Sequence, residues 1–177
     1  MACLLAGLGA RDQMTVAGLA GRQSGRPGLL ALALVTSFAT AAFAAYAAIK
    51  IAPQLNGDAR TIFAGIALVL AGGESLVMAP RRLPEEPTSS LGATAIVLLA
   101  HQLTDAARFL IFAIAVKTGA ALWAGVGGAL GGAAVVTLAW TFPEAFEWRN
   151  LRWVRRGIGT VLLLLGAWLI LRAMGRI

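Results

Sequence analysis

Cysteine, histidine and acidic residues are scarce in this chain of 177 residues. It has one cysteine, Cys3, one histidine, His101, and eight acidic residues. A disulfide framework needs at least two cysteines, and thiolate or HExxH metal sites need ligands that the chain does not have. No serine or cysteine has a nearby base of the kind that nucleophilic catalysis requires. We therefore expect a protein that is not an enzyme and in which Cys3 is inert.

Charged residues are also few, at 13% of the chain, whereas hydrophobic residues make up 59%. A soluble domain has about a quarter charged residues. The apolar residues form continuous runs of the length that a bilayer-spanning helix requires, rather than the alternating pattern of a β-barrel. The sequence therefore predicts an all-α polytopic membrane protein whose main partner is the lipid bilayer.

Six apolar segments are predicted to span the membrane. The predicted spans cover residues 2–20, 29–48, 61–79, 91–115, 119–140 and 157–174. An alternative is that the apolar run after Arg22 and Arg26 is the core of a secretory signal peptide. That alternative would leave residues 1–21 without a role.

The most hydrophilic stretch, residues 81–90, divides the chain into two halves, 1–80 and 91–177. Sliding the second half onto the first places Arg155 on Arg60 and aligns AGIALVLAGGESL with GIGTVLLLLGAWLI. Each half has three predicted spans, so the two halves would lie in the membrane with opposite orientations. The sequence thus predicts two inverted three-helix repeats, a design found in many secondary transporters.

Arginines at the ends of the apolar runs account for the net charge of +7. This placement orients a membrane protein and does not form a nucleic-acid-binding stripe, so we expect no nucleic acid partner. The side reached after spans one, three and five is richer in basic residues and is expected to be cytoplasmic, which places both termini outside the inner membrane. Its arginines are Arg22, Arg26, Arg81, Arg82, Arg149, Arg152, Arg155 and Arg156.

Charged residues interrupt the first predicted span of each half. Arg11 and Asp12 lie in the middle of the first span, and His101, Asp105 and Arg108 lie in the middle of the fourth. Ionisable groups at bilayer depth are costly and by default mark a transport pathway or a site. Helical spacing would place the three residues of the fourth span on one face. The matching interruptions predict a shared site where the two spans meet.

Three interpretations of this cluster stay open. In the first, the two arginines, two aspartates and one histidine neutralise one another and lock the two halves together. In the second, Asp105 takes and releases a proton while a cation exchanges, and His101 assists because histidine changes charge near neutral pH. In the third, Arg11 and Arg108 coordinate an anionic group.

The layout and the two interrupted spans resemble the Gdt-type cation/proton exchangers, small membrane proteins linked to manganese and calcium transport. Members of that family have Glu-x-Gly-Asp-Lys/Arg-Thr/Ser, usually followed by Gln, in each half. Residues 7–13 (GLGARDQ) and 102–108 (QLTDAAR) occupy the matching places. Gly9, Arg11 and Gln13 agree with the family pattern in the first half.

The departures from the family pattern fall on its carboxylates. The family's glutamate is Gly7 in the first half and Gln102 in the second, and its first aspartate is Ala10. Asp105 retains an acidic position, and Asp12 follows the first motif's basic residue in a different register. Hard dications prefer several oxygen ligands. The resemblance therefore implies a divergent exchanger in which Asp105 and Gln102 are the candidate metal ligands.

The resemblance implies exchange of a divalent cation, Mn²⁺ or Ca²⁺, for protons, without a firmly bound cofactor. The alternative is a structural or accessory membrane protein that retains the fold and has lost the metal site. Glu74, near the end of the third span, is expected to reach the membrane interface. Assembly into a homo-oligomer stays open. The candidate pathway residues are Asp105, Asp12, Gln13, Gln102, Thr104 and His101, with Arg11 and Arg108 as charge partners.

Overall fold

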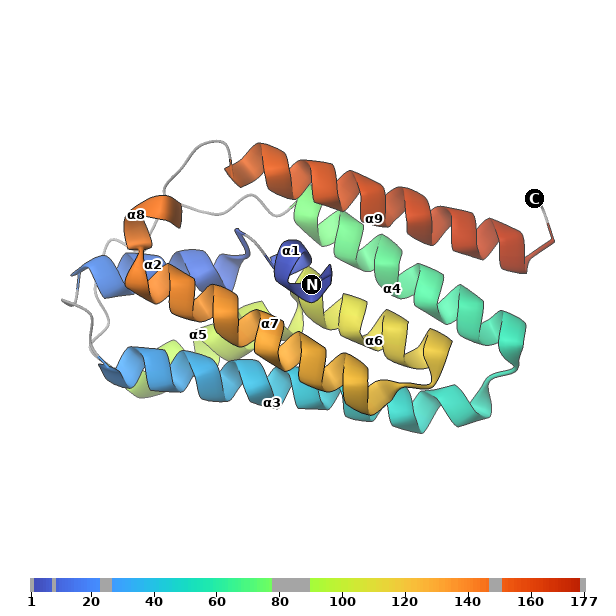
Figure 1. The fold of residues 1–177 in the computed structure, drawn as a ribbon, viewed down its shortest axis with the longest axis horizontal. Helices are drawn as coiled ribbons and strands as arrows, with labels where there is room; N and C mark the ends of the chain where they lie inside the picture. Colours follow the sequence, from blue (N-terminus) through green and yellow to red (C-terminus); the bar gives the residue numbers. More distant parts are fainter. Residues whose placement is uncertain (1, 8, 23–26, 78–89, 147–150, 176–177) are drawn as a thin grey trace.

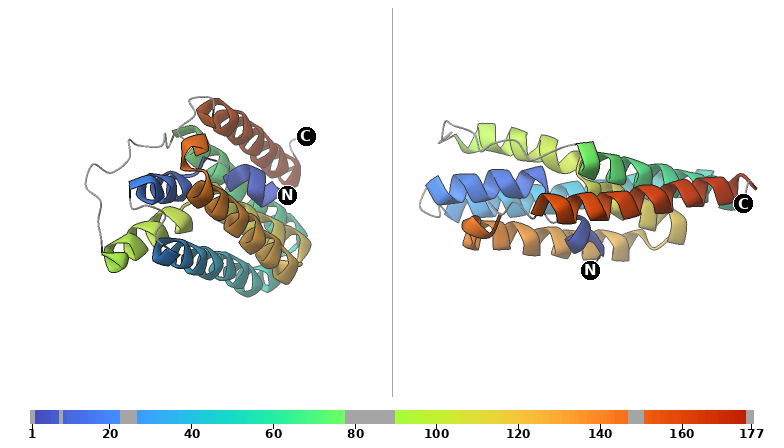
Figure 2. Two further views of the ribbon diagram at one scale, coloured as in Figure 1. Left: turned by 60° about the vertical axis from the view of Figure 1, so that its left-hand side comes forward. Right: turned by 90° about the horizontal axis from the view of Figure 1, so that it is seen from above.

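The computed structural model describes residues 2–7, 9–22, 27–77, 90–146 and 151–175. Every regular element in these ranges is helical, which confirms the all-α class (Figure 1). The predicted linker 81–90, apart from Ser90, lies outside the described residues. The axes of the long helices are roughly aligned with one another, as the two further views show (Figure 2).

Each half of the chain begins with two short helices and also contains two long ones. The first half forms α1 (Ala2–Gly7), α2 (Arg11–Arg22), α3 (Pro27–Ile51), the 3₁₀ turn η1 (Ala52–Gln54) and α4 (Gly57–Val77). The second half forms α5 (Leu91–Leu103), α6 (Ala106–Thr118), α7 (Ala121–Thr141), α8 (Pro143–Phe146) and α9 (Leu151–Ala173).

Four helices in the described ranges are long and apolar enough to cross a membrane: α3 with η1, α4, α7 and α9. Helices α5 and α6 meet the same criterion together, although they are bent by 48° at the break between them. The chain is therefore a multi-pass membrane protein with four such spans, or five if the bent pair is one span. The predicted span 2–20 is not among them. The 12 residues of α2 rise only about 18 Å, whereas the hydrocarbon core is about 30 Å thick.

Glycines allow α4 and α9 to pack against each other in antiparallel fashion (Figure 1). A Cβ atom on Gly72 would lie 2.6 Å from the carbonyl oxygen of Gly159, and a Cβ atom on Gly166 would lie 2.6 Å from that of Gly65. Lipid supplies no hydrophobic force for helix association, so close backbone approach at small residues is what holds such pairs together. The glycine pairs therefore fix α4 on α9.

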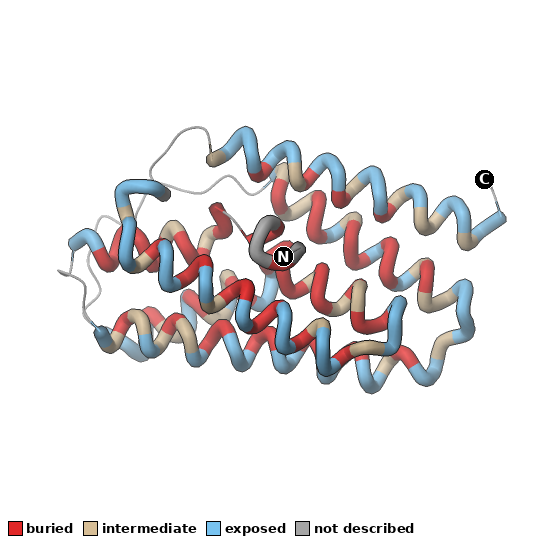
Figure 3. The backbone as a smooth tube through the Cα atoms, viewed as in Figure 1, coloured by how far each residue is buried: buried red, intermediate tan, exposed pale blue. Residues whose placement is uncertain are grey.

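Helices α3, α6 and α7 form the other main packing group. Buried alanines of α3, including Ala41 and Ala44, join Ile111 of α6 in the largest apolar cluster. A Cβ atom on Gly132 of α7 would lie 2.7 Å from the hydroxyl of Ser37, so this glycine lets α7 approach α3. Figure 3 shows buried residues along the facing sides of these helices and exposed residues on most of α9.

A candidate transport site at two helix breaks

The first break separates α1 from α2 and is closed by one glycine and one amide. Gly9 has φ of 73°, which belongs to the left-handed region that glycine adopts without strain. The N–H of Gly9 donates to Oε1 of Gln13 over 2.9 Å, and Nε2 of Gln13 donates to the carbonyl oxygen of Gly7. The candidate residue Gln13 thus satisfies backbone groups that the break would leave unpaired.

The second break separates α5 from α6 at Thr104 and Asp105. Asp105 is the N-cap of α6, and its carboxylate accepts a hydrogen bond from the N–H of Ala107 over 3.3 Å. A carboxylate at the start of a helix satisfies a free N–H group and interacts favourably with the helix dipole. Because the helix ends here, His101 and Arg108 lie on different helices. The expectation that they share one helical face with Asp105 is therefore wrong.

The two breaks lie side by side near the middle of the bundle (Figure 1). Nη2 of Arg11 donates to the hydroxyl of Thr104 over 2.9 Å, which connects α2 directly to the second break. One turn further along α2, the hydroxyl of Thr15 lies 3.4 Å from Nδ1 of His101. The structure therefore brings the charged interruptions of the two halves together.

The polar side chains at this junction are almost completely buried. Asp12 is 2% exposed, Asp105 is 3% exposed and Gln102 is 0% exposed. Asp12 lies at the start of α2 and Asp105 at the start of α6, so the two carboxylates belong to the two adjoining breaks. His101 is half-buried, and Thr104 is exposed. The junction is therefore a buried polar centre with a less buried edge at His101 and Thr104.

Arg108 anchors the second break to α3. Its Nη1 lies 3.5 Å from Oδ2 of Asp105, its Nε donates to the hydroxyl of Thr40 over 3.1 Å, and its Nη2 donates to the hydroxyl of Ser37 over 2.9 Å. These contacts neutralise Arg108 and hold one oxygen of Asp105. They support the role of Arg108 as a charge partner, because these described contacts already occupy its guanidinium and do not leave it free for an anion.

Glu74 and Arg155 complete the centre, and sequence analysis placed neither of them there. The Glu74 carboxylate binds Nη2 of Arg155 from α9, and Oε1 of Glu74 lies 3.6 Å from Nε of Arg11. Glu74 therefore lies between Arg155 of α9 and Arg11 of α2, and its side chain is buried among helices rather than exposed at an interface.

Arg155 also differs from its expected place in a loop on the basic side. Helix α9 begins at Leu151, six residues before the predicted span, and Arg155 is 2% exposed in its second turn. The lone acid of the apolar run 61–79 was the sequence signal for this pair, because an intramembrane acid is a candidate functional residue by default.

Several side-chain atoms of the centre are buried without a hydrogen bond in the described structure. Those of Arg11, Glu74 and Arg155 belong to the ion-paired side chains described above. Oδ1 of Asp105 and both amide atoms of Gln102 are buried without a hydrogen bond. No cation of the described chain lies within ion-pair distance of Asp12, whose Oδ1 accepts a hydrogen bond from the N–H of Gln13 over 2.8 Å. Buried polar atoms are normally paired. These atoms are therefore the groups available to a cargo.

The donor set is small for a metal ion. Across the described ranges, no group of three or more His, Cys, Asp or Glu side chains could hold a metal. Asp105 and Gln102 can contribute oxygen ligands, and Asp12 can contribute charge. Any bound dication would need further oxygens from water or the backbone, which is common for hard cations.

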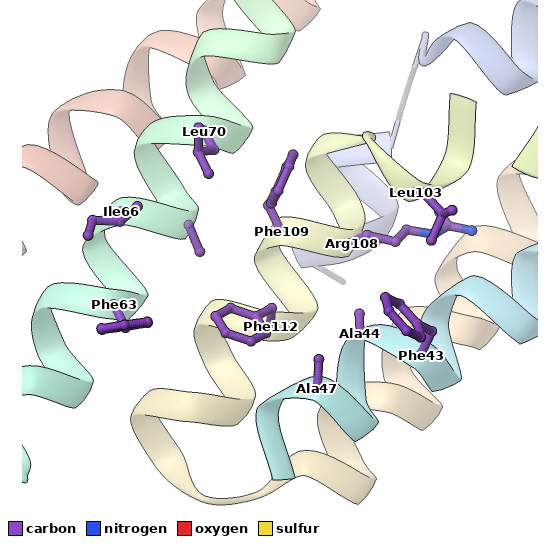
Figure 4. A pocket seen from close by; sticks show the side chains of 11 residues that line it. Phe43, Ala44, Ala47, Phe63, Ile66, Leu70, Leu103, Arg108, Phe109 and Phe112 are labelled. Atoms are coloured by element: carbon purple, nitrogen blue, oxygen red, sulfur yellow. The ribbon is translucent and has the colours of Figure 1, made fainter. Parts of the chain in front are cut away.

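An apolar crevice with a volume of about 270 Å³ lies between α3, α4 and α6 (Figure 4). Phe43, Phe63 and Phe112 line it, and Arg108 is its one charged lining residue. Because it offers no carboxylate, it supplies no ligand for a cation. In a bilayer such a surface is filled by hydrocarbon chains.

Comparisons with protein-family models, with curated proteins and with solved structures found nothing that matches this chain. The geometry of the two helix breaks is therefore the basis for assigning a function. That geometry joins two buried carboxylates, Asp12 and Asp105, to an unpaired amide at a junction between the two halves.

Proposed function

We propose that the protein is a divergent secondary transporter of the Gdt type that exchanges a divalent cation, Mn²⁺ or Ca²⁺, for protons across the cell inner membrane. One observation carries the proposal: the first helix of each half is broken at its charged motif, and the two breaks meet with Asp12 and Asp105 buried between them. Broken helices at corresponding places of two halves are the usual way in which transporters form a central site.

The packing of α4 on α9, the last long helix of each half, supports two inverted repeats. Gly65 and Gly72 of α4 have the same separation as Gly159 and Gly166 of α9, and each glycine of one pair faces a glycine of the other. A two-fold axis in the membrane plane would produce this reciprocal contact. The proposal further requires that α1 and α2 together cross the membrane as the third span of the first half, which would place both termini on the outer side, as the distribution of arginines predicts.

Asp105 is proposed to bind the proton and the cation in alternation. Arg108 holds Oδ2 of Asp105, which leaves Oδ1 for a cargo. A proton and a metal ion cannot occupy the same oxygen, so they compete, and this competition couples their movements in opposite directions. Oε1 of Gln102 is a neutral second ligand, and Asp12 contributes the second negative charge. His101, at the less buried edge beside Thr15, is the candidate for passing the proton outward.

The alternative function is that of a structural membrane protein. Two observations favour it: the described chain offers no group of three metal-binding side chains, and the centre has three buried or partly buried arginines, Arg11, Arg108 and Arg155, close to its carboxylates. In that case the charged network would only hold the two halves together.

Transport in proteoliposomes separates these two functions. We expect an imposed proton gradient to drive uptake of Mn²⁺ or Ca²⁺ by the wild-type protein, and the D105N variant to lose that uptake. The matched control is S75A, because Ser75 is buried beside Glu74 but belongs to no proposed ligand set. Absence of uptake by the wild type, or uptake unaffected by D105N, would support the structural alternative.

A further inference from the structure

Arg11 directly precedes Asp12 in α2, yet its guanidinium does not pair with that carboxylate. Its Nε lies 3.6 Å from Glu74, and its Nη2 donates to Thr104 over 2.9 Å. An ion pair to α4 and a hydrogen bond to the C-cap residue of α5 therefore hold the cation of α2. In the described structure, Asp12 is left without an ion pair although a guanidinium is on the adjacent residue.

Glu74 is itself fixed from the opposite side. Arg155 of α9 binds its second oxygen, and both side chains are almost fully buried. The contact of Gly72 with Gly159 brings α4 and α9 close enough for Arg155 to reach Glu74. The ion pair with a buried arginine holds the Glu74 carboxylate in place and away from the cargo site. Glu74 therefore stays beside Arg11.

We propose that Glu74 is a positioning residue that withdraws the Arg11 guanidinium from Asp12 and Asp105. Without it, Arg11 would turn to the unpaired carboxylate of Asp12, because a carboxylate offers an arginine charge attraction and a bidentate geometry that the Thr104 hydroxyl does not offer. Asp12 would then be neutralised and unable to attract a cation. Glu74 thus acts on the cargo site through Arg11 without touching the cargo. The transport consequence rests on the function proposed above.

The test removes the anchor without leaving a buried unpaired charge. The double variant E74Q/R155Q replaces both ions of the anchoring pair by neutral amides, which frees Arg11 and keeps the net charge of the protein unchanged. The triple variant R11Q/E74Q/R155Q then removes the freed guanidinium. If the charged network only held the helices together, the triple variant would be no better than the double variant, because it has lost one more charged contact.

The first readout is the rate at which Asp12 reacts with dicyclohexylcarbodiimide, which attacks the transiently protonated fraction of an otherwise ionised carboxyl group in apolar surroundings. It is measured by mass spectrometry of the Asp12 peptide from the full chain in detergent. An arginine partner stabilises the ionised form of a carboxylate and therefore slows this reaction. We expect Asp12 to react in the wild type, roughly fivefold more slowly in E74Q/R155Q, and again at about the wild-type rate in the triple variant. Equal rates in the wild type and the double variant, or no reaction in the wild type, would overturn the inference.

The second readout is Mn²⁺ uptake in proteoliposomes by the same proteins. We expect the double variant to lose roughly tenfold in uptake and the triple variant to recover most of that loss. If the labelling rates follow the expected order but the wild type moves neither Mn²⁺ nor Ca²⁺, the proposed function fails and the position of Arg11 stands. If the wild type moves Mn²⁺ and the double variant is equally active, the inference about Glu74 fails and the proposed function stands.

Discussion

The two helix breaks occupy corresponding places in the two halves but are built from different chemistry. The break between α1 and α2 is closed by neutral groups, namely the left-handed Gly9 and the amide of Gln13. The break between α5 and α6 is closed by an ion, because Asp105 caps α6 and is held by Arg108. The conformation of the first break is therefore fixed without the carboxylate of Asp12, whereas that of the second break depends on the carboxylate of Asp105.

The largest expected effect is the difference in stability between D105N and D12N. Asp105 neutralises the buried Arg108, so D105N leaves an unpaired buried charge and should cost about 3–5 kcal/mol in unfolding free energy. Asp12 has no such partner, and D12N should cost less than about 1 kcal/mol. Reversible unfolding in detergent micelles measures both values. Equal losses would show that the two breaks do not differ in this way.

A smaller loss is expected when the backbone of the first break is changed. G9A forces a side chain into the left-handed region and places a Cβ atom 3.0 Å from Cγ of Leu151, which should cost about 1–2 kcal/mol. The matched control is G127A in α7, where a Cβ atom meets nothing within 4 Å. The same unfolding measurement should find G127A neutral or stabilising. A neutral G9A would mean that the first break does not need glycine.

Effects of equal or smaller size should come from the uncharged side chains at the two breaks. Q13A removes two hydrogen bonds that satisfy Gly7 and Gly9 and should cost about 1–2 kcal/mol. T104V removes one hydrogen bond from Arg11 and should cost about 0.5–1 kcal/mol, since Glu74 still holds the guanidinium. Amide hydrogen exchange of residues 9–13 should increase in Q13A and stay unchanged in T104V. Faster exchange there in T104V would show that the two breaks depend on each other.

The apolar runs and their lengths predicted the all-α membrane class and most helix positions. Helices α3, α4 and α7 begin and end within about one turn of the predicted spans, because a bilayer fixes the length of an apolar helix. The charged interruptions also predicted where the two halves meet. The sequence did not show that the helices break there. At the first break, Gly9 is the residue that could have indicated a turn. At the second break, a turn capped by Asp105 is hard to distinguish from a continuous helix, because apolar residues continue on both sides.

The Glu74–Arg155 pair lay beyond the reach of sequence analysis for a physical reason. The two residues are 81 positions apart, and only the packing of α4 on α9 brings them together. Arg155 also resembled a loop arginine of the cytoplasmic side until α9 was seen to begin at Leu151. The periodicity of apolar residues shows which face of a single helix is buried. A buried ion pair also requires that the faces of two helices lie against each other, and the sequence pattern of one helix does not show this.

Proton release on addition of Mn²⁺ to the purified protein in weakly buffered detergent solution tests the central claim most directly. If Asp12 and Asp105 form one site at which a cation displaces a proton, the wild type should release protons in proportion to bound Mn²⁺, and D105N and D12N should each lose that release. Absence of release from the wild type would contradict the account. So would full release from D12N, because the two helix breaks would then not share a site.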